Sequence, residues 1–397
     1  MRLFFISAFT FLLCLSSLFA QNISLLSKVE YDVELSDIWG YTDEDGREYA
    51  LVSLENGTSI VDISDPSNPK EVANIPGGIS NWKDIKTYKN RAFVTGEYQQ
   101  GMQIIDLANL SNGEATSLFW EAPFGGFGRL GACHNIYIEE KTGVAYLSGC
   151  SIVGGGVLMF DITGELPAYL GKTNTTYSHD VYVRNDTIYS ADMNIGVFSI
   201  IDATNKSNPT VIANQSTPFQ FTHNTWLSDD GKTIFTTDEI GNSPLAAYDI
   251  SDVNDIKALD EFYPTGTKGT GLIPHNVHVK NDFLVTSYYA EGVVITDASR
   301  PNNLVQVGKF DTYDGPNSND YGAWGAFPFF SSNIILVTDI ENGLFILKPN
   351  YLRAAFFEGI VTDSITGEKL FGVQVEGVNR GVTVFEGQTG LDGSFEI

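Results

Sequence analysis

Basic residues are scarce in this 397-residue chain. Its 23 Lys and Arg residues stand against 49 Asp and Glu residues, which gives a formal net charge of −26. A field of this sign repels the phosphates of nucleic acids and the anionic headgroups of lipids. We therefore expect no binding to nucleic acid or to a charged membrane surface. The acidity suits a well-solvated surface in a salty medium and identifies no partner.

Long apolar runs are also missing, except for one at the N-terminus. Arg2 precedes the apolar run Leu3–Leu15, and a stretch of small residues follows as far as Ala20. This pattern is typical of a secretory signal peptide, here residues 1–20 with cleavage after Ala20. No other segment approaches the roughly 18 apolar residues that a membrane-spanning helix needs. The sequence predicts export without membrane insertion. A lipid anchor on Cys14 is disfavoured because the small residue expected before a lipidated cysteine is absent.

Cysteine is rare as well, with only Cys133 and Cys150 outside the predicted signal peptide. An exported chain with two cysteines favours a disulfide. Two apolar runs flank the turn at 140–143, and on the resulting hairpin the two cysteines lie opposite each other. The sequence predicts a Cys133–Cys150 disulfide, with a pair of buried free thiols as the alternative.

What the chain has in abundance is one repeated phrase, seen most clearly at 275–300. Three short β-branched and aromatic runs, separated by two-residue turns, predict an antiparallel meander. The copies start 44 to 52 residues apart, a period that predicts propeller blades. The seven starts are Asp37, Asp84, Asn135, Asp180, Asn224, Asn276 and Gly322.

A fourth apolar run follows the Asp and Ser or Thr that close each copy, so each blade is expected to have four strands. We interpret these closing aspartates as turn residues that bond backbone amides. The seventh copy lacks its fourth run. Residues 23–32 are similar to 304–314, the fourth run of the sixth copy, so they are predicted to supply the missing outer strand and close the ring. The predicted fold is an all-β, seven-bladed β-propeller over residues 21–350.

Two resemblances follow from these phrases. The segment 52–69, VSLENGTSIVDISDPSNP, resembles the LVIVD repeat, with echoes at 104–107, 200–209 and 293–301. The whole of 21–350 resembles the choice-of-anchor B proteins. This resemblance implies a secreted or cell-surface bacterial propeller whose C-terminal part varies between anchoring devices. It implies no established activity.

The composition changes near residue 355. Residues 355–397 resemble the start of a carboxypeptidase-regulatory-like β-sandwich, a module that usually acts as a non-catalytic spacer. A full sandwich has roughly 100 residues, so we expect a truncated module, with any anchoring signal beyond it.

Four of the five histidines occupy the same position in consecutive copies: His134, His179, His223 and His275. The first strand of a blade lines the central channel, so we expect these imidazoles to form a half-ring at one mouth. One interpretation is a single metal ion in the channel, such as copper or zinc, with Asp180, Asp37 and Asp84 as possible oxygen ligands. The alternatives are hydrogen bonding to the backbone of the adjacent blade and recognition of a ligand. His278 is expected to be a surface or packing residue.

Three long segments between blades, 119–129, 264–274 and 313–321, are candidates for a binding face. If they lie at the same end as the histidines, aromatic and polar groups surround the channel mouth, a common ligand position in propellers. The alternative is ordinary packed loops. The candidate ligand-binding residues are Trp120, Phe124, Phe127, Arg129 and Trp324.

No nucleophile elbow, zinc-protease helix or EF-hand loop is present in the sequence, so no catalytic residue is predicted. The first hypothesis is an exported or cell-surface propeller that binds a protein or a glycan through the loop face around its channel. The alternatives are a metal-dependent enzyme that uses the channel histidines and a structural surface-layer component. The sequence does not identify the ligand or the oligomeric state.

Overall fold

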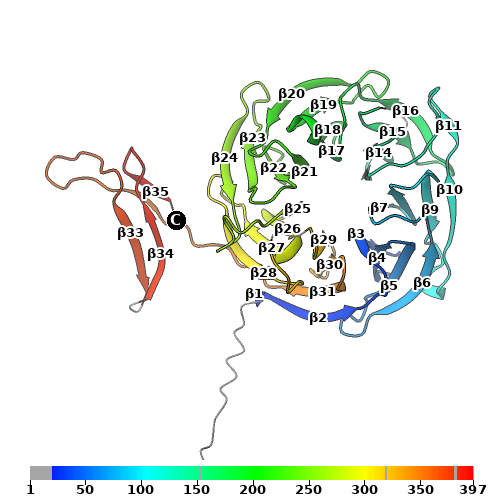
Figure 1. The fold of residues 1–397 in the computed structure, drawn as a ribbon, viewed down its shortest axis with the longest axis horizontal. Helices are drawn as coiled ribbons and strands as arrows, with labels where there is room; N and C mark the ends of the chain where they lie inside the picture. The colour runs from blue at the N-terminus through cyan, green and yellow to red at the C-terminus, as the bar shows by residue number, and fades with distance from the viewer. Residues whose placement is uncertain (1–19, 152–153, 318–319, 380–381, 397) are drawn as a thin grey trace, which may run out of the picture.

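The computed structural model describes residues 20–151, 154–317, 320–379 and 382–396. The predicted signal peptide, Ala20 excepted, lies outside the described residues. Seven antiparallel sheets, six of four strands and one of five, form a closed ring, with the innermost strand of each sheet at the centre (Figure 1). The prediction of an all-β, seven-bladed propeller is confirmed.

The strands follow one another from the channel outward in every blade. Blade 1 contains β3 (Leu35–Thr42), β4 (Glu48–Leu54), β5 (Gly57–Asp62) and β6 (Lys70–Pro76). Blade 2 contains β7 (Lys83–Tyr88), β8 (Arg91–Gly96), β9 (Met102–Asp106) and β10 (Thr116–Trp120). Blade 3 contains β13 (Asn135–Glu139), β14 (Val144–Ser148), β15 (Leu158–Asp161) and β16 (Ala168–Lys172). Blade 4 contains β17 (Asp180–Arg184), β18 (Thr187–Asp192), β19 (Val197–Asp202) and β20 (Thr210–Ser216).

The remaining blades continue this order. Blade 5 contains β21 (Thr222–Leu227), β22 (Thr233–Asp238), β23 (Leu245–Asp249) and β24 (Lys257–Phe262). Blade 6 contains β25 (Pro274–Lys280), β26 (Phe283–Tyr288), β27 (Gly292–Asp297) and β28 (Val305–Phe310). Blade 7 contains β29 (Ala323–Phe327), β30 (Ile335–Asp339), β31 (Gly343–Pro349) and, outermost, β2 (Ile23–Val29). Loops carry the short pair β11 (Pro123–Phe124) and β12 (Gly128–Arg129) and the 3-10 turns η1 (Leu110–Asn112), η2 (Met193–Ile195) and η3 (Tyr289–Glu291).

The position of a strand in its blade explains its residues. Inner strands are covered by neighbouring blades on both faces, so all seven residues of β4 are buried. The outermost strand of a blade has one solvent face, and β20 is therefore largely exposed. This is why an inner strand carries apolar residues on both faces, as in the run Ala50–Val52 of β4.

A glycine at the start of the third strand lets the fourth strand approach. At Gly292, φ is 72°, and a Cβ atom would lie 2.1 Å from the carbonyl oxygen of Phe310. At Gly343, φ is 100°, and a Cβ atom would lie 2.2 Å from the carbonyl oxygen of Val29. Only glycine fits such a contact without moving the outer strand. The glycine of this two-residue turn is therefore needed for the packing of the fourth strand as well as for the turn.

The N-terminal segment closes the ring as predicted. β2 pairs antiparallel with β31 from Ile23 opposite Pro349 to Val29 opposite Leu344. β1 (Ala20–Gln21) adds a short fifth strand to β28 of blade 6. Two neighbouring blades are therefore held by one continuous N-terminal segment.

The predicted start of the seventh copy is wrong by three residues. Gly325 pairs with Thr338 in the way that Asn224 pairs with Thr237 in blade 5, so Gly325 rather than Gly322 is the equivalent position. The misalignment has a simple cause. Blade 7 has no Asp or Asn at this position, so nothing in its sequence marks the register.

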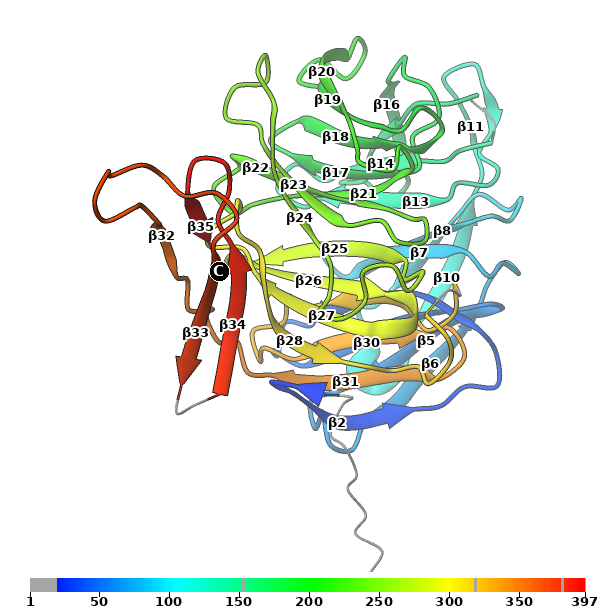
Figure 2. The ribbon, with the colours of Figure 1, turned by 60° about the vertical axis from the view of Figure 1, so that its left-hand side comes forward.

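Residues beyond the ring form two short antiparallel pairs beside the disc (Figure 2). These pairs are β32 (Glu358–Ile360) with β35 (Ser394–Glu396) and β33 (Gln374–Asn379) with β34 (Val382–Gln388). The ion pair between Arg300 and Glu358, at 2.9 Å, joins this region to blade 6. The carboxypeptidase-regulatory-like module stays a prediction. Among the residues that the structure describes, no helix is long and apolar enough to span a membrane.

The structure contains the Cys133–Cys150 disulfide, which lies two pairs of positions beyond Asn135 opposite Ser148, the last pair of the β13–β14 hairpin. Both cysteines are buried in the packing between blades 2 and 3.

A cross-link between residues 17 apart restricts the unfolded chain and thereby raises the free energy of unfolding by about 3 kcal/mol. We therefore expect a Cys133→Ala/Cys150→Ala variant to lose about 3 kcal/mol of unfolding free energy, measured by urea titration. Dithiothreitol should lower the stability of the parent protein to the variant's value and leave the variant unchanged. Two titratable thiols in the non-reduced parent would contradict this.

Candidate functional site

Equivalent positions on the seven inner strands form three tiers around the central channel. The histidine tier, at one mouth, consists of Ser36, Lys83, His134, His179, His223, His275 and Trp324. The next residue of each strand forms the middle tier: Asp37, Asp84, Asn135, Asp180, Asn224, Asn276 and Gly325. Two residues further on lies the aromatic tier: Trp39, Lys86, Tyr137, Tyr182, Trp226, His278 and Phe327.

The middle tier connects adjacent blades. Asp84 Oδ2 accepts a hydrogen bond from the backbone N–H of Ile136 at 2.9 Å. Asn224 Oδ1 accepts one from the N–H of Val277 at 3.0 Å. Each acceptor thus satisfies the backbone of the following blade. The predicted bonding between blades is present, and both these Asp and Asn side chains and His275, which bonds the carbonyl oxygen of Trp324, provide it.

The aspartates considered as metal ligands belong to this middle tier. Asp180 Oδ2 accepts a hydrogen bond from Nδ2 of Asn224 at 2.7 Å, and burial raises the pKa of Asp180 to about 7. Asp37 and Asp84 are hydrogen-bonded to Lys86. None of the three belongs to the group of nearby ligand atoms at the histidine mouth, and their role as metal ligands stays a prediction. Each carboxylate already accepts a hydrogen bond from a side chain of the channel wall.

Lys86 reaches back from the aromatic tier to the two aspartates. Its ammonium lies 2.9 Å from Asp37 Oδ2, contacts Asp84, and stands 4.5 Å from the ring centre of Trp39. Burial raises the pKa of Asp37 well above its usual value. At Asp84 burial also acts to raise the pKa, but the charge of Lys86 and the hydrogen bonds to Asp37, Lys86 and the backbone of Ile136 together lower it. The lysine therefore neutralises charge that the channel wall cannot solvate.

The four repeated histidines do gather in an arc. The ring centres of His134 and His179 are 4.1 Å apart, and each following pair, through His223 to His275, is 4.4 Å apart. Trp324 continues the arc, 4.6 Å from His275. The predicted half-ring of imidazoles is thus present at one mouth of the channel.

Two carboxylates accompany this arc. His134 Nδ1 lies 2.9 Å from Oε1 of Glu97, and this hydrogen bond, foremost among its causes, lowers the pKa of Glu97. Glu239 follows β22 and lies 3.5 Å from Nε2 of His223 and 3.8 Å from Nε2 of His275. Glu239 was not predicted from the sequence, although a signal exists: Glu55, Glu97 and Glu239 each directly follow the second strand of their blade.

Burial sets the protonation state of the arc. It lowers the pKa of His179 and His275 well below the usual value and lowers that of His223 as well. Neighbouring imidazoles act in the same direction because like charges would repel. At neutral pH these three rings are uncharged, and each carries a nitrogen lone pair.

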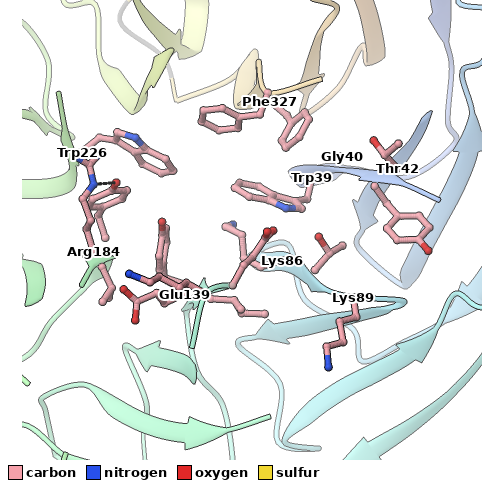
Figure 3. A pocket seen from close by; sticks show the side chains of 18 of the residues that line it. Trp39, Gly40, Thr42, Lys86, Lys89, Glu139, Arg184, Trp226 and Phe327 are labelled. Atoms are coloured by element: carbon pink, nitrogen blue, oxygen red, sulfur yellow. Dashed lines mark hydrogen bonds between the residues drawn. The ribbon is translucent and has the colours of Figure 1, made fainter. Parts of the chain in front are cut away.

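The opposite mouth of the channel is a pocket of about 680 Å³, formed above the aromatic tier (Figure 3). In Figure 3 the rings of Trp226 and Trp39 stand on either side of the opening. Trp226 packs against Tyr182 at 4.5 Å and against Phe329 at 5.7 Å between ring centres. Trp39 packs against Phe327 at 5.0 Å. We call this the aromatic pocket.

The aromatic pocket was not predicted from the sequence, although a signal for it exists. The residue two positions after the middle-tier residue is aromatic in five of the seven copies. The repeated histidines, which directly precede the middle-tier residues, were predicted as the site instead. Aromatic residues in strands are also typical of a core, and the repeat alone does not show which end of the channel is open.

The predicted binding residues lie in different places. Trp120 and Phe124 are 5% and 6% exposed and pack against Phe160, with 5.2 Å between ring centres in each case. β11, which holds Phe124, lies at the outer edge of the ring (Figure 1). The prediction that these two rings present a binding face is wrong, because they fill the space between blades 2 and 3.

The other three candidate binding residues also lie in different parts of the structure. Phe127 packs against Phe124 and Tyr169 in that cluster. Arg129 is exposed and forms an ion pair with Glu121 at 2.8 Å, so it belongs to the same outer segment. Trp324 lies in the histidine tier, where its carbonyl oxygen accepts a hydrogen bond from Nδ1 of His275 at 2.6 Å. Of the five candidates, Trp324 alone lines the channel.

The segments 264–274 and 313–321 do lie near the histidine mouth. Asn317 donates hydrogen bonds to Thr270 and to Glu291, which joins the two segments. Ile273 packs with Tyr289 and Trp324 beside His275. Residues 318 and 319 lie outside the described residues.

These features define the class of the protein: a closed seven-bladed β-propeller with a chemically distinct group of residues at each mouth of its channel. The model of the LVIVD repeat matches residues 47–75, which span one blade from β4 to β6. The β-propeller domain of Cps50 (Swd1) from Myceliophteria thermophila shares the fold, with a TM-score of 0.58 and 11% sequence identity. The similarity covers 83% of this chain and all of that one. No curated protein matches the chain.

Proposed function

We propose that this chain is an exported or cell-surface binding module that takes a saccharide into the aromatic pocket. Propellers commonly serve as binding modules. Export is supported by the N-terminal signal pattern and by the disulfide. The resemblance to choice-of-anchor B proteins supports display on a bacterial surface. The observation that carries the proposal is the aromatic tier around an open pocket.

The shape and lining of the aromatic pocket favour a small cyclic ligand. Its volume of about 680 Å³ lies within the range typical of ligand pockets. Trp39, Tyr137 and Phe329 are partly exposed, so ring faces are available to a ligand. A pyranose ring offers C–H groups on its faces and hydroxyl groups around its edge. The C–H groups suit the negative face of an aromatic ring.

Polar groups around the pocket complement the edge of a sugar. Lys89, Glu140 and Lys141 are exposed and line it. Arg184 and Lys86 also line it, but both already donate hydrogen bonds within the protein. Arg184 donates to Tyr182 and to the carbonyl oxygen of Ser228, and Lys86 donates to Asp37. The exposed lining is therefore not dominated by acidic groups, unlike the chain as a whole. We expect acidic saccharides to bind at least as well as neutral ones.

Replacing rings of the pocket is expected to weaken saccharide binding. The protein from residue 21 to 397 is first screened on a glycan array, and a hit is then titrated by calorimetry. Tyr137→Ala and Phe329→Ala should each weaken binding at least about tenfold, equivalent to about 1.4 kcal/mol, because each removes one contact face.

The matched control is Tyr321→Ala, which removes an exposed ring beside the histidine mouth. It should leave the affinity unchanged. An array without hits would overturn the proposal, as would equal losses of affinity in all three variants. Unaltered circular dichroism and melting temperatures are needed to show that the pocket variants are folded.

A further inference from the structure

Three ligand atoms of different residues converge at the histidine mouth. His179, His223 and Glu239 each offer one atom, and all three atoms lie within 4.8 Å of one another. His179 immediately precedes β17, His223 belongs to β21, and Glu239 immediately follows β22. The rigid inner edges of blades 4 and 5 therefore position the group.

The separations between these atoms match the coordination of one ion. In a tetrahedral zinc site with bonds of about 2.0–2.2 Å, two ligand atoms are about 3.3–3.6 Å apart. The distance from His223 Nε2 to Glu239 Oε2 is 3.5 Å. His275 Nε2 is 3.8 Å from the other oxygen of Glu239. The ligand atoms of His179, His223 and Glu239 all lie within 4.8 Å of one another, so the longer separations shorten when the three bind a common ion.

The hydrogen bonds around the group leave its inward-facing atoms available. Nδ1 of His179 and Nδ1 of His223 are buried without a hydrogen-bond partner among the described residues. The hydroxyl group of Tyr289 donates to Oε1 of Glu239 and fixes this carboxylate. His275 donates its Nδ1–H to the carbonyl oxygen of Trp324, so its Nε2 lone pair faces Glu239. Such partners behind the ligands are typical of metal sites.

Bonding to the backbone of the next blade explains the repeated histidine at His275, whose Nδ1 donates to the carbonyl oxygen of Trp324, but it does not account for the Nδ1 atoms of His179 and His223. The middle tier already bonds the backbones of neighbouring blades, as Asp84 and Asn224 show. A buried polar atom without a partner costs about 1–3 kcal/mol. The Nδ1 atoms of His179 and His223 lack such a partner within the described part of the chain, and on the other side of its ring His223 places Nε2 3.5 Å from Glu239, so the group can accept a further ligand.

We propose that His179, His223 and Glu239 bind one divalent first-row transition metal ion, such as Zn²⁺. Two imidazoles and one carboxylate suit such ions and leave a coordination position open. His275 is the nearest further nitrogen. The side chain of Glu239 is 24% exposed, which provides a path from solvent, and the net charge of −26 attracts cations. The site lies at the opposite mouth from the aromatic pocket and is independent of saccharide binding.

Metal stoichiometry and affinity test the proposal. The protein from residue 21 to 397, without a histidine tag, is stripped with chelator and titrated with Zn²⁺ by calorimetry, and bound metal is counted by elemental mass spectrometry. Co²⁺ serves as a spectroscopic probe, since a tetrahedral nitrogen and oxygen site gives visible absorption bands. We expect one equivalent of metal, and at least about hundredfold weaker binding in Glu239→Gln and in His223→Ala.

Two features of the variants keep the test decisive. Glu239→Gln retains an oxygen that accepts from Tyr289, so its fold should be intact even if His223→Ala is unstable. The matched control is Glu97→Gln, which changes a carboxylate bonded to His134 outside the proposed triad and should bind one equivalent. Less than about a tenth of an equivalent in the parent protein would overturn the proposal. Equal affinity in the parent and in Glu239→Gln would also overturn it.

Discussion

A chain that starts at Val33, and so lacks β1 and β2, is expected to lose most of its cooperative stability. Without β2, blade 7 presents β31 as an open edge, and the pairing from Ile23 to Val29 disappears. Each backbone hydrogen bond contributes about 0.5–1.5 kcal/mol, and the exposed apolar faces add to this loss. The total approaches the roughly 5–15 kcal/mol that stabilises a typical domain.

The loss also removes the connection between two blades. Asn22 donates its side-chain N–H to the carbonyl oxygen of Val307 in blade 6, and its own carbonyl oxygen accepts from the N–H of Asn350 after blade 7. Ser27 donates to the carbonyl oxygen of Pro66 in blade 1. The segment thus contacts three consecutive blades. We expect the truncated chain to melt at least about 15 °C lower or to aggregate, since an open strand edge pairs readily with other chains.

Adding the missing strand as a peptide distinguishes ring closure from a general effect of truncation. A synthetic peptide of residues 21–32 should bind the truncated chain by strand addition and raise its melting temperature in a concentration-dependent way. A peptide of the same composition in scrambled order is the control. A truncated chain with the parent's melting temperature would show that closure by β2 contributes little.

The fold was predictable because one pattern recurs seven times. The phrase at 275–300 alone is an ordinary three-stranded meander, but seven copies spaced 44 to 52 residues apart leave few architectures other than a propeller. The similarity of 23–32 to 304–314 then predicted the closing strand. The prediction failed at Gly322, where the repeat lacks an Asp or Asn and the register cannot be read from the sequence.

The candidate sites were only partly predictable, since sequence shows which residues repeat and not which atoms meet. The histidine arc followed from its repeated position. Glu239 and His223 both belong to blade 5, and their position beside His179 depends on how blades 4 and 5 pack. Trp120 and Phe124 were misassigned for the opposite reason, because an aromatic, glycine-rich loop has the same composition whether it fills a gap or faces solvent.

Lys86→Met is expected to destabilise the propeller by about 3–5 kcal/mol, because it leaves buried carboxylates without their counter-charge. Lys86 neutralises Asp37 and Asp84, and all three side chains are at most 10% exposed. The loss is measured as the difference in unfolding free energy between variant and parent in urea. Lys89→Met, which changes an exposed lysine three residues further on, is the control and should cost less than about 0.5 kcal/mol.

The destabilisation of Lys86→Met should grow as the pH rises from 4 to 8. Without the lysine, burial raises the pKa of both carboxyl groups above their values in the unfolded chain, as it already does for Asp37. A carboxyl group with a raised pKa in the folded state binds its proton more tightly there. It therefore lowers stability increasingly as the pH passes above the pKa of the unfolded chain. A loss that is equal at both pH values would contradict this electrostatic origin.

The other copies of the repeat indicate which substitutions should restore the stability lost in Lys86→Met. Asparagine occupies the middle tier at Asn135, Asn224 and Asn276, and the amide oxygen of Asn224 accepts the backbone N–H of Val277 as an aspartate would. Adding Asp37→Asn and Asp84→Asn to Lys86→Met should therefore restore most of the lost stability and abolish its pH dependence. The bonding between blades needs only an oxygen acceptor, while the two charges at these positions require the lysine. If the triple variant is no more stable than Lys86→Met, the lysine contributes through its packing against Trp39 rather than through its charge.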